Sequence, residues 1–110
     1  MISLSAYIPE MIETRRKLHK HPEIAWTEFL TTQVIVNRVR ELGFKTVLGE
    51  ALFNKDAVLG REPAVVEAAM ARSLKLGMDK KLLDEMQGYT GCMAIWETGR
   101  PGPVTALRFD

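Results

Sequence analysis

The sequence predicts an α/β fold in which helices alternate with short strands. Two segments near the N-terminus repeat apolar residues at the three- and four-residue spacing of amphipathic helices. A short run with alternating apolar and polar residues follows them, and two similar runs lie at the C-terminal end. Two further helical segments separate the first strand from the last two, so the 110 residues suit one small domain or part of a larger one.

The first two helices have recognisable ends. Pro9 suits the first turn of a helix, and Pro22 ends that helix because a residue before proline is displaced from the α region. Thr27 is expected to cap the second helix, which runs to a left-handed stop at Gly43 and is followed by a strand over residues 44–48. The apolar residues of this helix cover an arc too wide for one contact, so more than one neighbour should bury it.

The middle of the chain, residues 49–88, is predicted to be a helical insertion. After a polar loop, Pro63 opens a helix that ends at Gly77. Asp79 is expected to cap a shorter helix that ends at Gly88. These two helices lie between the first strand and the terminal pair of strands.

The C-terminal twenty residues are predicted to form a β-hairpin. The runs 92–97 and 104–109 read as strands, and Pro101 and Gly102 between them supply the φ angles that a tight turn needs. Asp110 follows the second run directly. Open α/β sheets bind ligands outside the carboxyl ends of their strands, so Asp110 is the candidate for a role near an active site.

The composition excludes several classes of function. A net charge of +1, with basic and acidic residues interleaved, gives no electrostatic footprint for nucleic acid or for an anionic membrane. The single cysteine, Cys92, excludes an internal disulfide and a multi-cysteine zinc site, and it agrees with a reducing compartment. No secretion signal and no apolar run of about 20 residues are visible, so a cytoplasmic protein is expected.

Other polar residues are weaker candidates for a site. His19, His21 and Glu23 could be drawn as a metal cluster, but their spacing forms no helical i, i+4 pair, so packing and helix ending are the favoured roles. Arg15 and Arg16 could clamp a substrate carboxylate, although arginines near a helix C-terminus more often border the core. No metal ligand and no cofactor-binding residue is therefore assigned.

Two stretches of the chain resemble one family of enzymes. The segment RRKLHKHPE at residues 15–23, followed by Glu28, Thr31 and ELGF at residues 41–44, resembles the N-terminal signature of metal-dependent amidohydrolases related to hippurate hydrolase and indoleacetyl-amino-acid hydrolase. The segment TGRPGPVTALRFD at residues 98–110 resembles the second signature of that family, which normally continues through a second aspartate. Both occur in the expected order, and together they cover essentially the whole chain.

The resemblance implies that residues 1–110 are the N-terminal fragment of a catalytic domain of the zinc carboxypeptidase-like aminoacylase type. The long spacing between the signatures, at residues 49–88, resembles that of the p-aminobenzoyl-glutamate hydrolase branch. In such enzymes two divalent metals, zinc or manganese, activate the water that attacks the amide of an N-acyl amino acid, and a glutamate acts as general base. By resemblance Asp110 is the first aspartate of an Asp-x-Asp pattern near the metal centre, a position from which a carboxylate can orient a histidine ligand.

The metal ligands and the base of this family lie downstream of Asp110, so the catalytic residues stay unknown and the fragment is expected to be inactive alone. The resemblance also implies a homo- or hetero-oligomer with a homologous subunit, and a small N-acyl amino acid such as p-aminobenzoyl-glutamate as substrate. The alternative is a short non-catalytic protein that binds a homologous full-length subunit through the open edge of its terminal strand.

Overall fold

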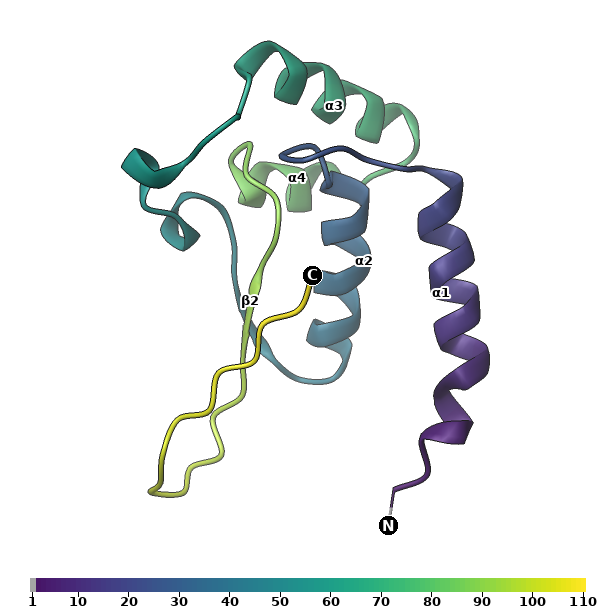
Figure 1. Ribbon diagram of the computed structural model, residues 1–110, viewed down its shortest axis with the longest axis vertical. Helices are drawn as coiled ribbons and strands as arrows, with labels where there is room; N and C mark the ends of the chain where they lie inside the picture. Colours follow the sequence, from purple (N-terminus) through teal and green to yellow (C-terminus); the bar gives the residue numbers. More distant parts are fainter. Residues whose placement is uncertain (1) are drawn as a thin grey trace.

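The computed structural model describes residues 2–110 and shows four helices and a small two-stranded sheet (Figure 1). The helices are α1 (Ile8–Lys20), α2 (Phe29–Glu41), α3 (Pro63–Lys75) and α4 (Lys80–Met86), and the 3-10 turns are η1 (Leu4–Tyr7), η2 (Gly49–Leu52) and η3 (Lys55–Ala57). The strands are β1 (Lys45–Val47) and β2 (Met93–Ile95). The predicted α/β class is confirmed.

The ends of α2 and α3 follow the sequence signals closely. Gly43 has a φ of +89°, and the N–H of Phe44 donates to the carbonyl oxygen of Val39 at 3.0 Å, as in a Schellman motif. Gly77, with a φ of +93°, ends α3 in the same way. The two glycines therefore end these helices because only they adopt a left-handed backbone without a steric cost.

The predicted cap of α2 is wrong. The Thr27 hydroxyl donates to the carbonyl oxygen of Ile24 at 2.6 Å instead of accepting from the helix. Only the backbone carbonyl of Thr27 reaches the helix, where it accepts from the N–H of Phe29 at 2.8 Å. The Thr27 side chain thus holds the turn that leads into α2, and the side chain that caps the helix comes from elsewhere.

The core lies where α2, α3 and α4 meet, as the wide apolar arc of α2 predicts. Seven apolar side chains of residues 2–110 are buried there: Phe29, Val36, Val66, Met78, Leu82, Leu83 and Met86. Five of these seven belong to residues 49–88. This middle segment therefore supplies most of the core and is no appendage to it.

The sheet joins two distant parts of the chain. β1 and β2 pair in an antiparallel register, with Lys45 opposite Ile95 and Val47 opposite Met93. The predicted pairing of the terminal hairpin is therefore wrong: β2 is there, but its partner is β1, and residues 104–109 form no strand. The chain does turn back after β2, as Figure 1 shows in yellow.

Residues 104–109 form no strand because their apolar side chains have no neighbouring surface to pack against. Val104, Leu107 and Phe109 are exposed, Phe109 to 85% of its surface. Strand preference is largely a measure of how side chains pack on neighbours, and these side chains have no such neighbours. Pro101 and Pro103 also lack the N–H groups that would begin a ladder.

Helix α1 packs loosely beside α2 and contains no buried residue. Its apolar side chains Ile8, Met11 and Ile12 are exposed. An ion pair of 3.1 Å between Arg38 Nε and Glu10 Oε1 links the two helices, but an exposed pair of this kind contributes no more than about 1 kcal/mol. None of the helices within residues 2–110 is long and apolar enough to cross a membrane.

Cys92 lies next to β2, half buried, with its side chain against the core. Burial raises the pKa of the Cys92 thiol, and the nearby positive charge of Arg40 opposes this only in part. Because the thiolate is the reactive form, iodoacetamide at pH 8 is expected to alkylate the folded chain several-fold more slowly than the chain unfolded in urea. Equal rates in the two states, followed by mass spectrometry, would contradict this placement of Cys92.

Candidate functional site

The first family signature lies at the junction of α1 and α2, where the structure separates the three residues of the hypothetical metal cluster. His19 is exposed on α1, and His21 follows the last residue of that helix. Glu23 turns toward α2, where its carboxylate accepts from the N–H of Leu30 and from the N–H of Thr31, both at 2.9 Å. The Thr31 hydroxyl donates to the same carboxylate at 2.7 Å.

Glu23 is therefore the cap of α2. The first N–H groups of a helix have no partner within the helix, and the positive end of the helix dipole stabilises a carboxylate placed there. The Phe29 N–H is satisfied by Thr27, and the next two N–H groups by Glu23. The acidic residue of the signature thus has a structural function in this chain, at the start of α2 and not at the end of α1.

Replacing Glu23 with glutamine is expected to lower the free energy of unfolding by about 1–2 kcal/mol, because an amide NH₂ would face helix N–H groups in place of a charged acceptor. Glu67→Gln is the matched control, since Glu67 is exposed on α3 and its carboxylate forms no hydrogen bond or ion pair within residues 2–110. Urea unfolding followed by circular dichroism compares the two. A loss as small as that of the control would show that Glu23 does not cap α2.

A second set of polar contacts holds the start of α2 against the segment before β2. The Thr90 hydroxyl donates to Glu28 Oε2 at 3.0 Å, and the N–H of Gly91 donates to the Thr32 hydroxyl at 2.8 Å. Thr32 and Thr90 are buried. Sequence reasoning missed these contacts, although Glu28 is part of the first signature; its distant partners could not be read from the chain.

An aromatic cluster encloses the loop that contains η2 and η3. Trp26 Nε1 donates to the carbonyl oxygen of Leu59 at 2.7 Å, and the ring of Phe53 stacks on that of Tyr89 with centroids 5.2 Å apart. The Arg61 guanidinium lies 4.6 Å from the centre of the Tyr89 ring. Cation–π and stacking contacts of this kind fix the loop to the end of α4.

The second signature leads to Asp110, which the structure places at an exposed position. The Asp110 side chain is 91% exposed, and its one ion-pair partner within residues 2–110 is Arg108, at 3.4 Å. Arg15 and Arg16 lie on α1, far along the chain from Asp110, and neither forms an ion pair within the described residues. Within the described residues no ion pair and no group of potential metal ligands joins Asp110 to the other predicted candidates.

The side chains of residues 2–110 do not fit a metal centre of the family. No three of their histidine, cysteine, aspartate or glutamate side chains come close enough to hold a metal ion. The carboxylate of Glu23 is committed to α2, and Cys92 is packed against the core. No catalytic step through a metal can be derived from these side chains.

Known proteins nevertheless match this chain in sequence and in fold. The chain is 41% identical over 102 residues to a p-aminobenzoyl-glutamate hydrolase subunit homolog of Haemophilus influenzae, a match that covers 92% of this chain and 24% of that protein. It is 34% identical over 105 residues to the indole-3-acetyl-aspartic acid hydrolase of Enterobacter agglomerans, covering 94% of the chain and 24% of that enzyme. No protein-family model matches the sequence.

A solved structure of a related protein also matches this chain in fold. The crystal structure of an aminobenzoyl-glutamate utilization protein from Klebsiella pneumoniae superimposes with a TM-score of 0.82 at 30% identity, covering 91% of this chain and 26% of that one. The chain is therefore similar in sequence and in fold to members of the amidohydrolase family that its two signatures resemble. Within that family it is similar to one subunit of p-aminobenzoyl-glutamate hydrolase, and it spans about a quarter of the length of the relatives it matches.

Proposed function

We propose that these 110 residues are the N-terminal segment of a cytoplasmic metallo-amidohydrolase that cleaves the amide bond of an N-acyl amino acid such as p-aminobenzoyl-glutamate. The segment acts as a structural part of the catalytic domain and does not hydrolyse amides alone. Zinc or manganese is the metal proposed for the whole enzyme, with its ligands outside this segment.

The single observation that carries the proposal is the match to the Haemophilus influenzae protein at 41% identity over 92% of the chain. The match in fold at a TM-score of 0.82 supports it independently of the two signatures. Residues 49–88 are proposed to be the insertion that distinguishes this branch from shorter relatives. Their large share of the core supports an insertion that became part of the catalytic domain.

The proposed inactivity of the segment rests on its chemistry. Amide hydrolysis by this family needs metal-bound water and a general base, and residues 2–110 do not gather three metal ligands. Asp110 is proposed to lie near the metal centre of the whole enzyme, although within the segment its carboxylate faces solvent.

The test is the mass and activity of the native product, captured from the source cells with an antibody raised against this chain. A product several times heavier than 12.4 kDa is expected, with hydrolysis of p-aminobenzoyl-glutamate that a chelator abolishes. The purified 110-residue chain, assayed with added zinc or manganese, should give no hydrolysis above buffer. A heavy product without amidase activity, or metal-dependent activity of the short chain, would contradict the proposal.

The second candidate is a short non-catalytic protein that binds a homologous full-length subunit. The exposed apolar side chains of α1 and of the C-terminal residues favour it, because isolated soluble domains rarely leave such surfaces uncovered. Two matched relatives are themselves named as one subunit of a hydrolase or as a homolog of it. A native product of 12.4 kDa that co-purifies with a hydrolase at fixed stoichiometry would favour this candidate over the first.

A further inference from the structure

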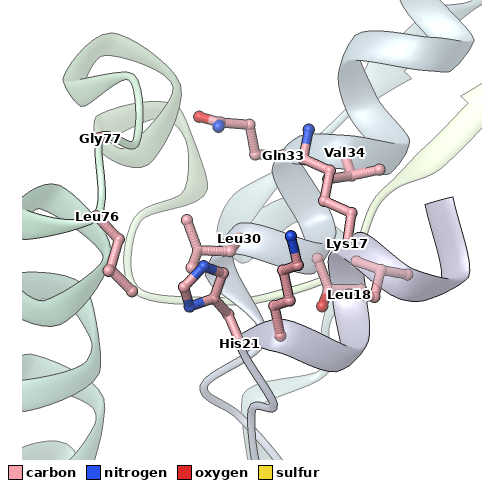
Figure 2. Close-up of a pocket in the computed structure, with 10 residues that line it drawn as sticks. Lys17, Leu18, His21, Leu30, Gln33, Val34, Leu76 and Gly77 are labelled. Atoms are coloured by element: carbon pink, nitrogen blue, oxygen red, sulfur yellow. The ribbon is translucent and has the colours of Figure 1, made fainter. Parts of the chain in front are cut away.

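A cavity of about 320 Å³ lies between the C-terminal end of α1, the first turns of α2 and the turn that joins α3 to α4 (Figure 2). This volume is at the lower end of the range that small-molecule sites occupy in proteins. Neither family signature predicts a site here, and the proposed amide hydrolysis does not use it.

The wall that α1 contributes is cationic. Lys17 and Lys20 are three residues apart, which places them on one face of the helix, and His21 follows at its end. No aspartate or glutamate lines the cavity. Within residues 2–110 no ion pair includes Lys17, Lys20 or His21. The positive charge on this wall is therefore not neutralised by a neighbouring carboxylate.

The wall that α2 contributes adds a donor. The Gln33 Oε1 atom accepts from the N–H of Asp79 at 2.9 Å, so the acceptor end of this amide is occupied and its NH₂ group is left to donate. Glu28, the acid nearest in the sequence to this wall, accepts a hydrogen bond from the Thr90 hydroxyl, and the Glu23 carboxylate is committed to Leu30 and Thr31. Figure 2 shows Gln33, Lys17 and His21 around the same space.

The rest of the lining is largely apolar and comes from Leu18, Leu30, Val34 and Leu76. A bare inorganic anion would leave this apolar surface in contact with water, whereas a ligand with an apolar body would cover it. We propose that this cavity binds a small organic carboxylate, with its apolar body against the leucines and its carboxylate toward Lys17, Lys20 and the Gln33 amide. This site is independent of the amide-hydrolysis reaction.

The first experiment measures binding of benzoate to the 110-residue chain by ligand-observed saturation-transfer NMR, which works for a monomer and for an associated chain alike. Benzoate is expected to bind saturably with a Kd of about 1–10 mM, because a few exposed charge-assisted hydrogen bonds add little to a small apolar contact. Benzamide, which keeps the ring without the charge, is observed in the same way, and inorganic phosphate, which keeps charge without the ring, is measured by its competition with benzoate; each should bind at least about fivefold more weakly. Equal binding of benzamide or of phosphate would overturn the proposed ligand class.

Variants then locate the site. Lys17→Met and Lys20→Met keep most of each side chain and are expected to weaken benzoate binding about three- to tenfold each. Lys81→Met, an exposed lysine on α4 outside the cavity, removes the same charge and should leave the Kd within about twofold. Leu76→Trp, at a partly exposed position on the rim, should abolish binding by filling the space. Absence of saturable binding, or equal weakening by Lys81→Met, would overturn the site.

Discussion

Replacing Phe29 with alanine is expected to lower the free energy of unfolding by about 3–5 kcal/mol. Phe29 is the first residue of α2, fully buried, and the largest side chain of a core that holds seven buried apolar residues within residues 2–110. Its removal leaves a cavity between α2, α3 and α4 that the fixed helices can fill only in part. In so small a core this loss is most of the available stability, so the urea midpoint should fall to near zero.

Phe109→Ala is the matched control for this variant. It deletes the same side chain at a position that is 85% exposed, and it should change the free energy of unfolding by no more than about 0.5 kcal/mol. Urea unfolding of both variants, followed by circular dichroism, separates the effect of burial from that of the substitution. Comparable losses in the two variants would mean that the core is not where α2, α3 and α4 meet.

The helices were predictable because their signals are local. Pro22, Gly43 and Gly77 act on the backbone at their own positions, through a missing α conformation before proline or a left-handed φ. The order of the helices could therefore be read without knowledge of any contact. The wide apolar arc of α2 also predicted correctly that more than one neighbour buries this helix.

The pairing of the strands could not be read in the same way. The turn residues at Pro101 and Gly102 predict that the chain reverses, but not that residues 104–109 find a partner. Pairing depends on which apolar faces are available to cover, and β1 meets β2 through contacts between segments far apart in the sequence. The cap of α2 also depends on a contact that is not local. The adjacent Thr27 was predicted to cap this helix, but the cap is Glu23, which lies seven residues before Leu30, whose N–H group it binds.

The candidate site residues were predicted from their place in the chain and from a family resemblance. The signatures resemble those of one enzyme family, yet no spacing within them shows that Glu23 caps a helix or that Asp110 lies exposed beside Arg108. The α1 wall of the cavity belongs to the first signature, but the cavity itself could not be read from that motif, because the other walls come from α2 and the α3–α4 turn, which only the fold brings together. Sequence motifs therefore predict the class of protein here, and contacts between helices decide what each side chain does.

Replacing Gly49 with alanine is expected to lower the free energy of unfolding by about 2–5 kcal/mol. Gly49 is buried at the start of η2, with a φ of +74°, where the loop lies against the end of α4. A Cβ atom at this position would clash with the Oε1 atom of Gln87 and would lie 2.9 Å from the backbone carbonyl oxygen of Glu85. The Gln87 side chain cannot simply move away, because its Oε1 atom accepts from the N–H of Glu50 at 3.0 Å.

Gly60→Ala separates the two causes of this loss. Gly60 has a similar φ of +69°, but an added Cβ would meet no atom within 4 Å, so only the cost of a left-handed backbone remains, about 1–2 kcal/mol. The difference between the two variants in urea unfolding therefore measures how closely η2 approaches α4. If Gly49→Ala costs no more than Gly60→Ala, the loop does not lie against the Glu85 carbonyl. The attachment of residues 49–60 to the core would then depend on the aromatic contacts of Phe53 and Tyr89 instead.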